Sequence, residues 1–227
     1  MTAWRDALWL AKFELKDLWK MSLLLGLLLF TIIVLFTSSF PSYLEDHFTL
    51  FDVLFIGTFS IVPMWMLPKA FQVKRVHSEL YATPISIMLQ HLPIKRTTII
   101  KSRMIIYLVY AYILQIPLLG LLYLFSSDIR ALMTPLTYIV FAMLWLSFST
   151  AVGVEFVGGA IGISVEKKSN LFILKILLTF AIGIGIYFLL QYVVPVGIVH
   201  LTINLAQQWP FLTLAVSIVF AFVRFQY

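Results

Sequence analysis

Long apolar runs separated by short polar passages form the main pattern of the chain. Six runs predict membrane-spanning helices, because a hydrocarbon core of about 30 Å takes about 20 apolar residues. Their expected ranges are about 21–40, 50–67, 104–125, 132–163, 171–194 and 210–223. Pro63 should kink the second run, and Asp52 lies near its outer end, where a carboxylate can reach water. The expected fold is an all-α, polytopic membrane protein in which residues 1–227 form a single transmembrane domain.

The first twenty residues have a different pattern, in which apolar and charged positions follow the helical period. At about 100° per residue, a single arc gathers the apolar side chains. This arc consists of Trp4, Ala7, Leu8, Ala11, Leu15, Leu18 and Trp19. Segment 3–20 is therefore predicted to be an amphipathic helix that lies in the membrane interface, with its cations toward lipid headgroups. The alternative is a cytosolic extension of the first span.

One long polar passage, residues 69–103, interrupts the apolar runs. It contains seven basic residues, which are Lys69, Lys74, Arg75, Lys95, Arg96, Lys101 and Arg103. Its middle predicts a short helix over 84–92, because Thr83 can cap a helix and Pro84 suits the first helical position. Ile85, Met88, Leu89 and Leu92 would share one face of this helix. Such a face either inserts into a groove of a partner protein or lies on the membrane or on the chain's own bundle.

Composition and charge support this topology. The chain is 62% hydrophobic and 11% charged, with a mean hydropathy of +1.01, whereas soluble domains are about 25% charged. With six spans, fifteen of the sixteen Lys and Arg residues fall on the side of the two termini, and Arg130 is the exception. Basic residues are retained on the cytoplasmic side, so both termini are predicted to be cytoplasmic in the cell membrane. The net charge of +6 is thereby assigned to topology and anionic lipid, and no nucleic-acid partner is expected.

Few residues suggest chemistry. The absence of cysteine excludes disulfides, thiolate metal sites and thiol catalysis. The sequence has no G-x-x-x-x-G-K-[ST] phosphate loop, so any ATP must be hydrolysed by another polypeptide. No metal site and no catalytic residue is predicted. The polar groups most suited to meet a cavity within the spans are Glu155, Gln115, Gln191, Tyr107 and Tyr112. An intramembrane carboxylate usually faces the bundle or a water-filled cavity, although Glu155 could instead pair with a loop cation or be protonated.

The segment that follows Pro195 is semi-polar. Residues 200–208 are expected to form a re-entrant or interfacial piece before the last span. His200 and Asn204 would also suit an intramembrane protease of the CAAX-processing type. Such an enzyme also needs a paired Glu-Glu to activate water, and no adjacent acidic pair lies in any expected span. This alternative is therefore supported only by His200 and Asn204.

The run from Glu79 to Arg103, ELYATPISIMLQHLPIKRTTIIKSR, resembles the first cytoplasmic loop of type-2 ABC permeases. In that family an acidic residue precedes a short apolar coupling helix, and Leu-Pro and a basic cluster follow it. Here these features are Glu79, segment 85–89, Leu92-Pro93 and Lys95-Arg96. The amphipathic N-terminus and the six spans are similar to the same family. Pro84 departs from the pattern, because it interrupts what is often a longer helix.

The resemblance implies a permease subunit of an ATP-driven exporter. Such a subunit pairs with a second permease, alike or unlike, and binds cytosolic ABC ATPase subunits that hold ATP and Mg, with no cofactor on this chain. The ATPase-docking residues would be Glu79, Pro84, Ile85, Met88, Leu89 and Leu92. The small number of polar groups in the spans favours a lipid-like, drug or hydrophobic peptide cargo. A non-transporting membrane sensor or immunity component would share the same loop and stays open as an alternative.

Overall fold

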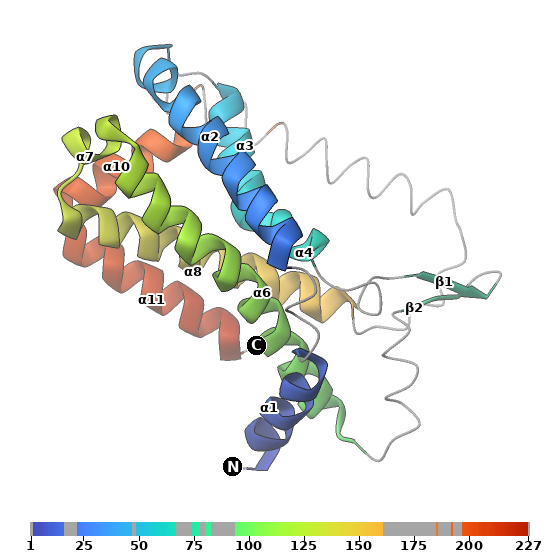
Figure 1. Cartoon of the computed structure of the whole chain (residues 1–227). Helices are drawn as coiled ribbons and strands as arrows, with labels where there is room; N and C mark the ends of the chain where they lie inside the picture. Colours follow the sequence, from blue (N-terminus) through green and yellow to red (C-terminus); the bar gives the residue numbers. More distant parts are fainter. Residues whose placement is uncertain are drawn as a thin grey trace.

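A computed structural model of the chain describes residues 2–15, 22–46, 49–66, 74–77, 80–82, 94–160, 185, 192 and 197–226. Most of these residues are helical, and the helices pack as a bundle (Figure 1). The helices are α1 (Thr2–Glu14), α2 (Ser22–Asp46), α3 (Thr49–Ser60), α4 (Val62–Trp65), α6 (Arg96–Phe125), α7 (Ser127–Leu132), α8 (Pro135–Ala160), α10 (Ile198–Gln208) and α11 (Pro210–Gln226). In Figure 1, α1 lies beside the start of α6, whereas α7 and α10 lie beside its far end.

Three of these helices contain stretches long and apolar enough to cross a membrane, which confirms the expected multi-pass character. The stretches are Leu24–Glu45, Thr97–Phe125 and Pro135–Val154. The pair Ile198–Gln208 and Pro210–Val223, bent by 117°, makes a fourth if it is taken as one broken span. The expected span 171–194 lies outside the described residues except for the helical positions 185 and 192. The described residues therefore establish three or four candidate spans, and the count of six remains a prediction.

The second apolar run is shorter and more broken than a single span. Helix α3 has 12 residues, which gives a rise of about 18 Å, less than the hydrocarbon core of about 30 Å. The helix stops before Ile61, and α4 begins one residue later with Pro63 in its first turn. Proline is tolerated there because its missing N–H would have no helical partner. The helix is thus interrupted within three residues of Pro63, where the sequence predicts a kink.

Helix α2 continues past Pro41 to Asp46, six residues beyond the expected end of the first span. Phe40 and Tyr43, on either side of this extension's start, are both buried. Their rings lie 5.8 Å and 4.5 Å from the ring of Phe51 on α3, between centroids. Aromatic pairs at these separations add stability beyond their buried area, so contacts with α3 hold the helix together where the local sequence favours a turn.

The core of the bundle is largely aromatic. Phe51, Phe55 and Phe59 recur every four residues along α3 and are all buried. Phe55 stacks on Phe59 at 4.9 Å and meets Trp145 of α8 edge-on at 4.7 Å, between centroids. The row of rings joins α2, α3 and α8 in one cluster, and α8 also packs against α6, α10 and α11.

The N-terminal helix packs on α6. Its buried residues are Ala7, Leu10 and Ala11, whereas Leu8 and Trp9 are exposed. Leu10 packs with Ile99 near the start of α6. The expected amphipathic helix is present over most of its range. Its buried face contains Leu10 in place of Leu8, which the predicted apolar arc included. The position of α1 in the membrane interface stays a prediction.

A hydrogen-bonded corner joins α10 to α11. The backbone N–H of Trp209 and the hydroxyl of Thr213 both donate to the carbonyl oxygen of Leu205, each at 3.0 Å. Thr202 on the buried face of α10 accepts a hydrogen bond from the indole N–H of Trp145 at 3.2 Å. Hydrogen bonds therefore connect α10 to α11 across the bend and to Trp145 in the core.

The polar loop contains a two-stranded antiparallel ribbon that the sequence pattern did not predict. It consists of β1 (Lys74–His77) and β2 (Leu80–Ala82), and Lys74 pairs with Ala82 and Arg75 with Tyr81. The expected coupling helix, residues 84–92, lies outside the described residues.

Candidate functional site

Gln115 lies at a helix interface in the middle of α6 and is fully buried. Its side-chain amide donates to the hydroxyl of Ser149 on α8 at 2.8 Å and to the carbonyl oxygen of Phe59 on α3 at 3.3 Å. Polar side chains in membrane proteins commonly bind neighbouring helices together in this way. The structure thus places Gln115 between three helices and away from the open cavity described below.

Tyr107 lies two turns earlier on α6 and faces the same stretch of α8. Its ring fills a notch at Gly153, and a Cβ added to this glycine would overlap the ring. The Tyr107 hydroxyl donates to the carbonyl oxygen of Ser149 at 3.5 Å. Gln115 and Tyr107 therefore both hold α6 to α8 through Ser149, and the close approach of the two helices depends on Gly153.

Tyr112 points out of this interface toward the side of the bundle. Its hydroxyl lies 2.8 Å from the hydroxyl of Thr150. The Thr150 hydroxyl donates to the carbonyl oxygen of Leu146 at 2.8 Å, and it has one proton to give. Tyr112 must then be the donor to Thr150. The pair forms a fixed polar spot on a wall that is otherwise apolar.

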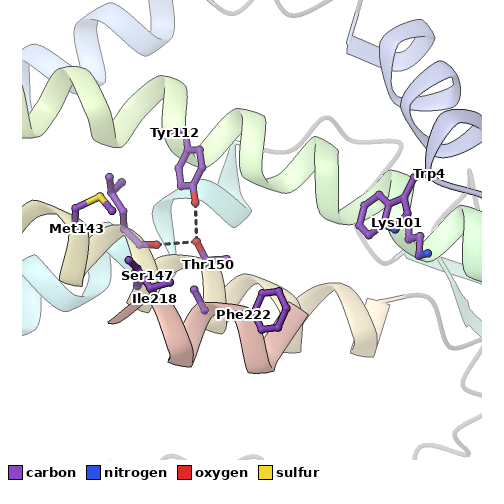
Figure 2. Close-up of a pocket in the computed structure, with 10 residues that line it drawn as sticks. Trp4, Lys101, Tyr112, Met143, Ser147, Thr150, Ile218 and Phe222 are labelled. Carbon is purple, nitrogen blue, oxygen red and sulfur yellow. Dashed lines mark hydrogen bonds between the residues drawn. The ribbon is translucent and has the colours of Figure 1, made fainter. Parts of the chain in front are cut away.

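An open cavity of about 770 Å³ lies between α1, α6, α8 and α11. Its lining residues are Trp4, Lys101, Tyr112, Met143, Leu146, Ser147, Thr150, Ile218, Ala221 and Phe222. This volume lies within the range of about 300–1,000 Å³ that is typical of small-molecule sites. Figure 2 shows Lys101 and Trp4 at one end and the Tyr112–Thr150 pair among apolar side chains at the other.

The cationic end of the cavity is organised by an aromatic ring. The ammonium nitrogen of Lys101 lies 4.4 Å from the centroid of the Trp4 ring, a distance at which a cation is attracted to the face of the indole. No acidic residue is among the ten that line the cavity. The cavity therefore offers an amphipathic molecule one positive end, an apolar wall and a small hydroxyl patch.

A second polar cluster lies at the start of α10 and was missed from sequence. Asp52 was expected to reach water, but it is fully buried. Its carboxylate accepts hydrogen bonds from the backbone N–H groups of Ile198 and Val199, both at 2.9 Å, and from the hydroxyl of Tyr43 at 2.8 Å. The first amides of a helix have no partner within it, and a carboxylate is also favoured by the helix dipole there.

Tyr43 and Gly197 complete this cluster, which we call the Asp52 clasp (Tyr43, Asp52 and residues 197–200). The Tyr43 hydroxyl accepts a hydrogen bond from the backbone N–H of His200 at 3.0 Å. Gly197 has a φ of +86°, and a Cβ there would lie 2.8 Å from the Asp52 carboxylate and overlap the Tyr43 hydroxyl. Glycine permits both the backbone conformation and the close approach. The signal in the sequence was an aspartate inside an apolar run together with a glycine before a semi-polar helix.

The other residues predicted as sites are not placed by the structure. Glu155 lies in α8, but its side chain is outside the described part of the structure, and Gln191 is outside it altogether. The same holds for the docking residues Glu79, Pro84, Ile85, Met88, Leu89 and Leu92. Within the described residues, no group of three or more His, Cys, Asp or Glu side chains is arranged to hold a metal ion.

Replacing Gln115 by leucine is expected to lower the free energy of unfolding by about 1 kcal/mol, the order measured for hydrogen bonds between membrane helices. The change removes the amide that joins α6 to Ser149 and Phe59 and keeps a similar side-chain volume. Thermal unfolding of the purified chain in detergent micelles measures the effect. Gln208→Leu, at an exposed position of α10, is the control and should change stability by less than about 0.5 kcal/mol. An unchanged midpoint for Gln115→Leu would contradict the structural role.

Comparison with known proteins gives no matching family model, no matching curated protein and no matching solved structure.

Proposed function

We propose that the chain is the membrane-spanning permease subunit of an ATP-driven ABC exporter, and that its cargo is a lipid-like molecule, a drug or a hydrophobic peptide. The observation that carries this proposal is the open cavity between α1, α6, α8 and α11. It has the volume of a ligand site, one cation and an otherwise mostly apolar lining. A cavity of this kind suits a cargo molecule with one polar end and an apolar body.

The topology of the proposal is six spans with both termini in the cytoplasm, in the cell membrane. The distribution of Lys and Arg supports this arrangement, because fifteen of the sixteen would lie on the cytoplasmic side. Three or four candidate spans are consistent with it. The last eight residues of the expected loop 69–103 form the first turns of α6. The cytoplasmic end of α6 would then hold Lys101 at the cationic end of the cavity.

Energy would come from a separate cytosolic ABC ATPase that binds ATP and Mg, because the sequence has no phosphate loop of its own. A second permease subunit, identical or related, would complete the transport unit. The sequence from Glu79 to Arg103, which resembles the coupling loop of type-2 ABC permeases, supports docking through the apolar face of segment 84–92. Helix-in-groove recognition uses apolar anchors with this spacing.

Leu89→Asp is expected to abolish association with the ATPase, because it puts a charge into the centre of the proposed apolar docking face. The wild-type chain, solubilised gently from its own membranes, should co-purify with an ABC ATPase and with Mg-dependent ATP hydrolysis. Gln90→Asp is the matched control, because it adds the same charge one residue away on the polar side of the predicted helix. Its complex should survive. An intact, active complex with Leu89→Asp would refute this docking surface.

A non-transporting membrane sensor is distinguished by a second measurement. The complex is reconstituted in vesicles, and movement of a fluorescent amphiphile between leaflets is followed with and without ATP. An exporter predicts ATP-dependent movement that Leu89→Asp abolishes. A sensor predicts ATPase binding with no movement of the amphiphile.

A further inference from the structure

The cavity has a polarity gradient along the axis of α6. Lys101 and Tyr112 line it from the same helix, eleven residues apart, which corresponds to about 16 Å along the helix axis. This length is close to one leaflet of the hydrocarbon core, which is about 15 Å for a bilayer core of about 30 Å. A molecule held at Lys101 by a charged head could therefore extend its tail along the cavity to about the level of Tyr112.

The wall along this path is apolar and open on one side. Met143 and Leu146 of α8 and Ile218 and Phe222 of α11 contribute its apolar lining. Ile218 and Phe222 are exposed, as are neighbouring apolar residues of α11 such as Val219. If α11 forms part of a membrane span, as the proposed function requires, this exposed apolar surface beside the cavity would face the hydrocarbon.

The cationic end favours an anion. Lys101 is only partly exposed and its ammonium lies against Trp4. Among the described residues, no acidic side chain lines the cavity to neutralise it. Cationic side chains at the cytoplasmic membrane surface attract anionic lipids, and an indole beside the headgroup region is the usual position of tryptophan in membrane proteins.

From these three observations we infer that the cavity binds an anionic phospholipid, with its phosphate at Lys101 and an acyl chain along Met143, Leu146, Ile218 and Phe222. The source of the anion is a membrane lipid, because an apolar wall of one-leaflet length would be left uncovered by a free phosphate. The inference deepens the proposed function, on which it rests, by naming the class of molecule that the transport cavity takes.

The test measures the proximity of lipid chains to position 222 on α11, which lines the proposed path of the acyl chain. The full chain is placed in phosphatidylcholine nanodiscs, and phosphatidylglycerol with brominated acyl chains is added at increasing mole fraction. Bromine quenches tryptophan fluorescence at contact, and the signal at position 222 is obtained as the difference between Phe222→Trp and the wild-type chain. We expect saturable quenching at a low mole fraction of the anionic lipid, and weaker, non-saturating quenching by brominated phosphatidylcholine.

Lys101→Gln should weaken the apparent affinity for the brominated anionic lipid about fivefold, the effect of one basic residue at the membrane surface. Lys101→Arg should retain the affinity, and its retention shows that the site still folds when this position is changed. Lys95→Gln, an exposed cation one residue before α6, is the matched control and should bind as the wild type does.

Three results would overturn the inference: equal quenching by the anionic and the zwitterionic lipid, wild-type affinity in Lys101→Gln, or displacement of the lipid by soluble glycerol phosphate. The last result would indicate a site for a free phosphate. The measurement needs neither ATP nor an ATPase. A failure here would therefore leave the Leu89→Asp experiment intact, and a failure of ATPase docking would leave lipid binding to stand alone.

Discussion

Replacing Asp52 by alanine should lower the free energy of unfolding of the purified chain by about 3–5 kcal/mol, because each buried donor left without an acceptor costs about 1–3 kcal/mol. The change leaves the amides of Ile198 and Val199 and the hydroxyl of Tyr43 without their acceptor. Buried donors that lose their partners are more costly than the hydrogen bonds were worth. Unfolding in mixed micelles of increasing denaturing detergent, followed by circular dichroism, measures the difference.

The control for this experiment is Asp128→Ala. Asp128 is also an aspartate in the first turn region of a helix, α7, but it is only partly buried, and its helix-dipole contribution should be below about 1 kcal/mol. A double substitution with Tyr43→Phe should show coupling, because both side chains belong to the Asp52 clasp. Wild-type stability in Asp52→Ala, or strict additivity with Tyr43→Phe, would mean that the clasp does not hold α10 in place.

The second large effect is expected for Gly153→Val. A Cβ at this position would lie 2.6 Å from Cζ of Tyr107 and closer still to two other ring atoms. The ring is buried between α6 and α8, so the two helices must separate or Tyr107 must leave its position. Overpacking of this kind is destabilising, and we expect a loss of about 3 kcal/mol, measured by the same detergent titration.

Gly120→Val is the matched control for Gly153→Val. Gly120 also lies inside a long membrane helix, and a Cβ there meets nothing within 4 Å, so its effect should be limited to helix propensity, below about 1 kcal/mol. Shortening Tyr107 to alanine should partly restore Gly153→Val, giving a double variant more stable than the sum of the two single changes predicts. Equal losses at the two glycines, with no recovery, would show that the Gly153 notch is not the cause.

The parts of the fold that sequence could predict are those set by local hydrophobicity. The apolar runs gave the positions of α2, α6, α8 and α11, because burial or lipid exposure of about 20 apolar residues leaves few alternatives to a helix. Pro63 marked the break between α3 and α4 for a similarly local reason. The four-residue spacing of Phe51, Phe55 and Phe59 also places them on one helix face, which is buried in the core.

The rest depended on contacts between distant segments. Pro41 favours a turn locally, and rings of α2 and α3 keep the helix intact beyond it. Asp52 binds the amide of Ile198, 146 residues away, a pairing that no periodicity within either segment indicates. The cavity also combines a residue identified from sequence with residues brought together by packing. Tyr112 was predicted to meet a cavity, whereas Lys101 and Trp4 come together only because α1 packs on α6.

The corner between α10 and α11 has a structural consequence. Because the Thr213 hydroxyl on α11 donates to the Leu205 carbonyl oxygen of α10, a hydrogen bond across the bend helps to fix the angle between the two helices. The N-terminus of α10 lies at the carboxylate of Asp52. Asp52 on α3 is thus connected, through α10 and this corner, to the helix that carries Ile218 and Phe222, two of the residues lining the cavity.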